Sequence, residues 1–171
     1  MRYKHNDELK SEFIKYFGVD KWNSEELMAK LWPDIIRICN YLGVEPIPVV
    51  MDSLEDDSRY MINDNYIIIS DRLVNDTIEA RKCLIHELRH YYQFICIEHK
   101  LGNKKLRKHW IEDLKKDYTK LKDYEKLGLS FEVDAYAFTK YLMKKMYNKD
   151  CPFPADWYDE ILDKYIFTYL A

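Results

Sequence analysis

Long apolar runs are absent from this sequence, and no stretch approaches the ~20 consecutive apolar residues that a membrane-spanning helix needs. The polar residues 1–10 also lack the apolar core of a signal peptide, so we expect a cytoplasmic protein without a membrane partner. Low-complexity tracts are missing and 47% of the residues are hydrophobic, a composition that disfavours a disordered chain. The net charge of −3 provides no general attraction to nucleic acid, and we expect no nucleic acid as a partner.

Cysteine and glycine are both scarce, with four residues of each in the chain. The cysteines are widely separated and form no C-x-x-C pair, so we expect reduced thiols, mostly in the core, and no disulfide framework. Each glycine follows a phenylalanine or leucine that ends an apolar or helical run, as expected of glycines that cap helix C-termini. The sequence therefore predicts helices at about 7–17, 24–42, 76–101, 103–127, 130–148 and 155–169.

Between the second and third of these helices, short segments rich in β-branched and aromatic residues alternate with turn-like stretches. The segments are Ile47–Met51, Arg59–Ile62 and Tyr66–Ser70. We expect a small antiparallel sheet of about three strands, whose last strand leads into the helix at 76–101. Asp76, with Glu79 three residues later, predicts a capping-box start for that helix. The chain length fits a single domain over 1–171 with a mostly helical α+β fold.

The helix expected at 76–101 contains an H-E-x-x-H sequence, His86-Glu87-Leu88-Arg89-His90. Residues four apart on a helix project from nearly the same face, so the imidazoles of His86 and His90 can reach one metal ion. Glu87 lies to the side of that pair, where it can take a proton from a water molecule that the metal activates. This combination of ligands and base indicates zinc and peptide-bond hydrolysis. At about 100° per residue, Arg89 falls on neither this face nor the apolar face opposite.

A catalytic zinc ion needs a third protein ligand and one open position. Glu132 and Asp134, near the start of the helix expected at 130–148, lie about 200° apart on it, so only one of them can face the metal. We choose Glu132, because the small Ala135 on the same side allows the two helices to approach closely, and we keep Asp134 as the alternative. A solvated carboxylate in the first turn of a helix is the competing explanation for Glu132.

The pentapeptide followed by Glu132-x-x-Ala135-x-x-Phe138 resembles the gluzincin metallopeptidases. In particular it is similar to the minimal gluzincins and the compact ImmA/IrrE-type proteins of bacteria and their mobile elements. The resemblance covers about residues 45–147 and implies a zincin-like fold, in which a small sheet precedes the active-site helix and the glutamate-bearing helix. It also implies a zinc metallopeptidase with a narrow protein substrate in the same cell, such as a regulatory or repressor protein.

One position departs from the family pattern. Many relatives carry Asp or Asn four residues after the glutamate, where it can orient a ligating histidine, and here that position is Tyr136. The Tyr136 phenol could accept a hydrogen bond from an imidazole N–H, stabilise an oxyanion, or simply fill a helix interface. His109 is a second oxyanion candidate, for which a partly exposed helix histidine is the competing explanation.

Two other classes of function remain open on the sequence alone. A regulatory binding protein would keep the zincin scaffold and cleave little or nothing, although the intact Glu87 argues against an inactive site. A metal-free helical interaction domain would bind no zinc. If the protein is a hydrolase, we expect an extended peptide or protein substrate to pair with the exposed edge of the sheet, at Tyr66–Ser70.

Overall fold

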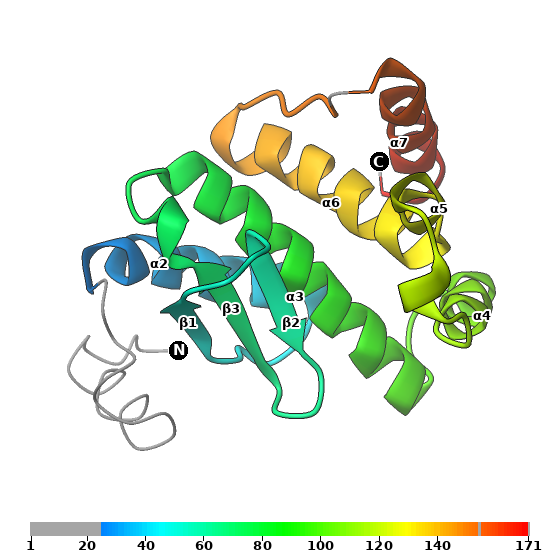
Figure 1. The fold of residues 1–171 in the computed structure, drawn as a ribbon, viewed down its shortest axis with the longest axis horizontal. Helices are drawn as coiled ribbons and strands as arrows, with labels where there is room; N and C mark the ends of the chain where they lie inside the picture. The colour runs from blue at the N-terminus through cyan, green and yellow to red at the C-terminus, as the bar shows by residue number, and fades with distance from the viewer. Residues whose placement is uncertain (1–24, 154, 171) are drawn as a thin grey trace. The chain divides into compact units, whose positions relative to one another are not determined.

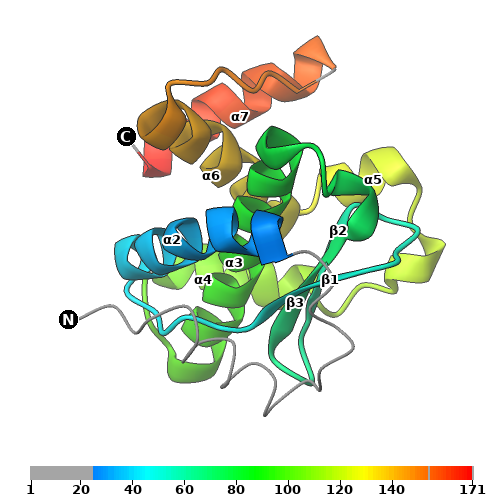
Figure 2. The same cartoon turned by 90° about the vertical axis from the view of Figure 1, so that its left-hand side faces the viewer.

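The computed structural model of the protein describes residues 25–153 and 155–170, and the helix expected at 7–17 lies outside them. The described residues are mostly helical with one small sheet, which confirms the expected α+β class (Figure 1, Figure 2). Two compact units, Met1–Leu84 and Ile85–Ala171, divide the chain, and the single domain stays a prediction. No stretch of helix among the described residues combines the length and the hydropathy that a bilayer crossing requires.

The first unit contains a three-stranded sheet in the order β1-β3-β2 (Figure 1). Its strands are β1 Val49–Asp52, β2 Ser58–Met61 and β3 Tyr66–Ser70. The sheet is mixed, because β1 runs parallel to β3 and β2 runs antiparallel to it, so the expectation of a purely antiparallel sheet is wrong. β3 is the central strand, and the expectation that Tyr66–Ser70 offers a free edge to a peptide is also wrong. Its uninterrupted apolar residues, Ile67 to Ile69, are typical of a strand that is buried on both faces.

Helix α2, Glu25–Leu42, packs through apolar residues spaced three or four apart, which places them on one helix face. The buried residues with this spacing are Leu27, Leu31, Ile35 and Ile38. The buried Asp34 carboxylate accepts a hydrogen bond of 2.8 Å from Arg81, which ties α2 to the first turns of the following helix. Gly43 ends α2 at a φ of +72°, a left-handed cap as the sequence predicts.

The following helix, α3 (Thr77–His99), carries the H-E-x-x-H sequence. The Asp76 carboxylate accepts hydrogen bonds from the backbone N–H groups of Ile78 and Glu79, at 3.2 and 3.0 Å, so Asp76 caps α3 as expected. The Glu79 carboxylate accepts from the ammonium group of Lys82, at 2.8 and 3.0 Å. The start of α3 therefore has the expected cap, with the Glu79 side chain directed along the helix.

The single helix expected at 103–127 is wrong, because this segment is broken into three short elements. They are α4 Lys104–Asp113, the 3₁₀ turn η3 Tyr118–Lys120 and α5 Asp123–Leu127. At the break, the Asp117 carboxylate accepts hydrogen bonds from the backbone N–H and the hydroxyl of Thr119, at 3.2 and 2.7 Å. Such local side-chain bonds compete with helix continuation, which explains why the charged segment does not form one helix.

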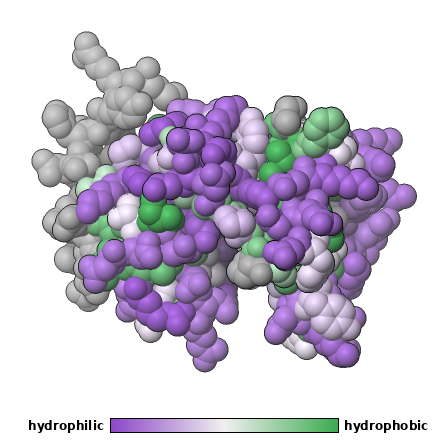
Figure 3. All heavy atoms as spheres, turned by 90° about the horizontal axis from the view of Figure 1, so that it is seen from above, coloured by the Kyte–Doolittle hydropathy of each residue, from purple (hydrophilic) through white to green (hydrophobic). Residues whose placement is uncertain are grey.

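Helices α6 (Ser130–Tyr147) and α7 (Asp156–Tyr169) pack against each other in the second unit (Figure 1). The centre of this packing contains the buried Ala137 of α6 with Tyr158 and Leu162 of α7. Beside it, the ammonium group of Lys140 pairs with the carboxylates of Asp159 and Asp163, at 2.7 and 2.6 Å. Seen from above, the surface is mostly hydrophilic, and apolar side chains show only in small separate places (Figure 3).

The four cysteines all lie among the described residues and are free thiols, in agreement with the expectation of no disulfide framework. Cys39 and Cys96 are buried, and Cys83 and Cys151 are partly buried. Burial raises the pKa of the Cys39 thiol to about 12. The sequence predicts that most of the cysteines lie in the core, and two of the four, Cys39 and Cys96, are fully buried.

Candidate metal centre

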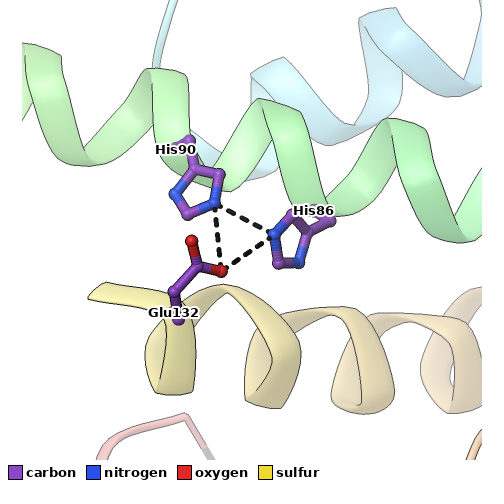
Figure 4. A group of neighbouring side chains, drawn as sticks. All are labelled: His86, His90 and Glu132. Carbon is purple, nitrogen blue, oxygen red and sulfur yellow. Dashed lines mark hydrogen bonds and ion pairs between the residues drawn. The ribbon is translucent and has the colours of Figure 1, made fainter. Parts of the chain in front are cut away.

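Two imidazoles of α3 and one carboxylate from the first turn of α6 converge on a single point (Figure 4). The Nε2 atoms of His86 and His90 lie 3.0 Å apart. The Oε2 atom of Glu132 lies 3.3 Å from Nε2 of His86 and 3.6 Å from Nε2 of His90. The structure thus brings together the three residues that the sequence analysis selects as metal ligands.

The three donor atoms match the requirements of a zinc ion in both chemistry and spacing. Two imidazole nitrogens and one carboxylate oxygen form a donor set found in catalytic zinc sites. Tetrahedral bonds of about 2.0–2.1 Å place the ligand atoms about 3.3–3.4 Å from one another. The observed separations of 3.0, 3.3 and 3.6 Å lie around this value. The residues present therefore fit zinc.

The site is largely enclosed, with side-chain exposures of 13% for His86, 10% for His90 and 13% for Glu132. Burial alone would raise the pKa of the Glu132 carboxyl, but hydrogen bonds and charge from the two histidines hold that pKa well below its usual range. Burial lowers the pKa of His90, while Glu132, Glu87 and Gln93 together raise it to about 9. The enclosed carboxylates thus stabilise positive charge at the point where the donor atoms meet.

Glu87, the residue expected to act as base, lies on α3 next to His86 in the chain and is 7% exposed. Its negative charge contributes to the raised pKa of His90, which shows that the carboxylate acts on the site electrostatically. His109, the weaker oxyanion candidate, is exposed on α4 and does not belong to the cluster of His86, His90 and Glu132.

The orientation of the His90 ring is set by Gln93, a residue that the sequence analysis does not select. Nδ1 of His90 lies 2.9 Å from the amide oxygen of Gln93. The amide nitrogen of Gln93 donates to the backbone oxygen of Phe131 at 2.8 Å and to the Asp134 carboxylate at 2.6 Å. Gln93 is three residues beyond His90, and residues at this spacing are neighbours on a helix surface. This spacing is the sequence signal that could have identified Gln93 as a partner of His90.

Asp134, the alternative ligand, does not face the cluster and is completely buried. Its carboxylate accepts two hydrogen bonds from the Arg89 guanidinium, at 2.7 and 2.8 Å. Tyr165 of α7 donates a further hydrogen bond to it at 3.0 Å. Arg89 is 7% exposed and forms a buried ion pair with Asp134 between α3 and α6. Its position on the helix, away from both the histidine face and the apolar face, does not predict this pair.

Aromatic rings on either side of Glu132 pack against the two histidines. The Tyr136 ring lies 4.4 Å from the His86 ring, and the Phe131 ring lies 5.1 Å from the His90 ring, measured between centroids. The Tyr136 ring also packs against the ring of Tyr158 on α7 at 6.0 Å, which favours the helix-interface explanation for Tyr136. Among the described residues, nothing hydrogen-bonds to the buried Nδ1 of His86.

The start of α6, which carries Glu132, is held by a residue from α4. The N-cap position is Leu129, whose side chain cannot accept a hydrogen bond. The Asp113 carboxylate accepts instead from the backbone N–H of Ser130 at 2.6 Å and from the Ser130 hydroxyl. The short helix α4 thus fixes the first turn of the helix that contributes the carboxylate of the cluster.

Comparison with known proteins gives no family assignment: no protein-family model matches the chain, and no match was found among curated proteins or solved structures. The gluzincin resemblance therefore stays a prediction from the two short sequence elements that carry it. The features that bear on function are the geometry of His86, His90 and Glu132 and the position of Glu87 beside them.

Proposed function

We propose that the protein is a zinc metallopeptidase that hydrolyses peptide bonds. The observation that carries this proposal is the convergence of Nε2 of His86, Nε2 of His90 and Oε2 of Glu132 within 3.0 to 3.6 Å of one another. The spacing and chemistry of these atoms fit zinc, and a glutamate directly follows the first ligand in the chain. Structural zinc sites usually have four protein ligands, so a three-ligand set favours catalysis.

The protein side chains divide the chemistry between them. His86, His90 and Glu132 would hold the zinc ion, which when bound supplies the Lewis acidity that activates water and polarises the carbonyl of a peptide bond. Glu87 takes the proton of the attacking water and passes it to the leaving amine. The low exposure of these side chains keeps the Glu87 carboxylate in a poorly hydrated environment, where electrostatic interactions within the site are stronger than in water.

The first experiment measures the metal content of the protein, purified without chelator, by mass spectrometry. We expect about one zinc ion per chain in the wild type, bound by the three-residue set found among the described residues, and less in His86→Ala. His109→Ala is the matched control, because His109 is an exposed helix histidine outside the cluster, and it should retain the metal. Wild-type protein that binds no zinc even when zinc is supplied would refute the metal site and leave a helical interaction domain.

The second experiment tests peptide-bond hydrolysis with a library of unstructured peptides whose products are identified by mass spectrometry. Cleavage by the wild type that is lost in His86→Ala supports the proposed function. A zinc-loaded wild type that cleaves none of the library would instead favour a regulatory binding protein built on the same site. Because the expected substrate range is narrow, the library should include folded proteins from the host cell in a parallel assay.

A further inference from the structure

The hydrogen bonds around Gln93 determine which nitrogen of His90 carries a hydrogen. One end of the Gln93 amide faces two acceptors, the Phe131 backbone oxygen and the Asp134 carboxylate, so this end is the NH₂ group. The other end is therefore the amide oxygen, which can only accept. It accepts from Nδ1 of His90 at 2.9 Å, so Nδ1 carries a hydrogen and Nε2 is the ring nitrogen that can bind a metal.

The Asp134 carboxylate is the point at which Gln93 is connected to the rest of the unit. Its Oδ2 atom accepts from Gln93 at 2.6 Å and from Arg89 at 2.8 Å. Its Oδ1 atom accepts from Arg89 at 2.7 Å and from the Tyr165 hydroxyl at 3.0 Å. A carboxylate has about four lone-pair positions, and these four bonds use all of them. Asp134 is completely buried and therefore separated from the bulk water that replaces a lost bond at an exposed carboxylate.

Tyr165 belongs to α7, whereas the other members of this chain of bonds belong to α3 and α6. Its hydroxyl therefore connects the C-terminal helix to a metal-ligating histidine through two intervening side chains. Loss of that bond leaves one lone pair of a buried carboxylate unsatisfied, and the Arg89–Asp134 pair can then rotate away from Gln93. The position of the His90 ring depends on this pair remaining in place.

We infer that the hydrogen-bond relay from Tyr165 through Asp134 and Gln93 to His90 makes the docking of α7 and metal binding at His90 mutually dependent. The relay rests on the proposed function only in taking zinc as the ligand of His90. Coupling of this kind is reciprocal: if docked α7 strengthens zinc binding, then bound zinc strengthens the docking of α7 by the same factor. Tyr165 is a positioning residue in this arrangement, since it touches neither metal nor substrate.

The test compares two phenolic hydroxyls on the same helix. Tyr165→Phe removes the hydroxyl that enters the relay. Tyr158→Phe, the matched control, removes a buried hydroxyl that donates to the backbone oxygen of Leu127 at 2.8 Å, outside the relay. Gln93→Leu breaks the relay next to the histidine. The zinc dissociation constant is measured with a chromophoric chelator, and hydrogen exchange of the α7 amides is measured with and without zinc.

We expect Gln93→Leu to weaken zinc binding by about 10–100-fold, the range found for groups that orient a ligating histidine. Tyr165→Phe should weaken it by a smaller but measurable factor, and Tyr158→Phe should leave it unchanged. Zinc should slow amide exchange in α7 of the wild type and of Tyr158→Phe, and the slowing should be lost in Tyr165→Phe.

Two results would overturn the relay. One is equal zinc affinity for Tyr165→Phe and Tyr158→Phe, and the other is α7 exchange in the wild type that does not respond to zinc. Both require that the wild type binds zinc, so they leave the proposed function intact. A wild type that binds no zinc is a different result, since it overturns the metal site itself and with it the relay.

Discussion

Arg89 stands between the two histidines of the cluster in the sequence, and its guanidinium is buried against Asp134. It also lies over the rings of Tyr92 and Phe138, at 4.6 and 4.7 Å from their centroids. Replacing Arg89 by Leu leaves the buried Asp134 carboxylate without its counter-charge. We expect Arg89→Leu to lower the free energy of unfolding by about 3–5 kcal/mol, measured by urea denaturation.

The matched control for this residue is Lys120→Leu. Lys120 also pairs with an aspartate, Asp117 at 2.8 Å, but the two side chains are 80% and 49% exposed. We expect little change in the free energy of unfolding for the control, because water screens an exposed pair. Equal losses in the two variants would contradict the conclusion that burial decides the strength of the Arg89 pair.

Glu87 is the residue on which turnover depends in the proposed mechanism. Glu87→Gln keeps the shape of the side chain but removes its basicity, so peptide cleavage should fall by about 10²–10⁴-fold while the zinc content stays the same. Glu79→Gln, a change to a partly exposed glutamate on the same helix and outside the cluster, is the control and should cleave normally. Cleavage by Glu87→Gln at the wild-type rate would show that another group takes the proton.

For single residues, the sequence predicts which side chains share one face of a helix. It does not predict contacts between side chains on different helices. The four-residue spacing of His86 and His90 predicts that they share one helix face, and in the structure both imidazoles lie next to the Glu132 carboxylate. The partner of Arg89 could not be predicted, because Asp134 lies on another helix and no spacing rule connects the two. The same holds for Gln93, whose role depends on what faces it from α6.

Among the secondary-structure elements, the short helix α4 stabilises the start of α6, because its Asp113 carboxylate accepts hydrogen bonds from Ser130. Burial raises the pKa of the Asp113 carboxyl, but bonds from Lys116 and Ser130 lower it by more, so the pKa lies below its usual range. A carboxyl with a depressed folded-state pKa stabilises the protein above its unfolded pKa of about 3.9. That contribution is lost as the pH falls through the folded-state value.

We therefore expect Asp113→Ala to lower the free energy of unfolding by about 0.5–2 kcal/mol at neutral pH, the usual cost of a lost helix cap. The difference between variant and wild type should shrink as the pH falls from about 4 towards the lower folded-state pKa, since protonation of the wild-type carboxyl removes the charge that caps α6. Asp123→Ala, a change to a 98% exposed side chain in the first turn of α5, is the control. A difference that stays constant down to pH 2 would contradict this account of the cap.

The elements themselves show where sequence patterns suffice. The helices α2, α3, α6 and α7 agree with the predicted ranges to within a few residues, because each has apolar periodicity and recognisable end signals. The sequence pattern does not reveal the break between α4 and α5, because a charged segment has little apolar periodicity. The break depends on the hydrogen bonds that Asp117 accepts from Thr119. The strand order was missed as well, because pairing between β1 and β3 depends on contacts far apart in the chain.

For the molecule as a whole, zinc should act as a stabilising ligand. At a free zinc concentration of about 100 times the dissociation constant, the folded state gains ~2.7 kcal/mol. For a chain of this size, Tm changes by about 2–4 °C per kcal/mol, so a rise of about 5–10 °C is expected. Calorimetry with zinc and with a chelator measures it, and His86→Ala is the control that should not respond. An equal response in that variant would indicate zinc binding elsewhere.

The interruption between α4 and α5 has a consequence for engineering. Residues 114–120 are all exposed, and they separate the part of the chain with both imidazoles from the part with the carboxylate ligand. Exposed connections of this kind are where chains tolerate cutting or insertion. A gene divided there would yield two fragments, neither of which contains a complete ligand set. Their reassembly would report the presence of zinc, and the protein would become a two-piece sensor.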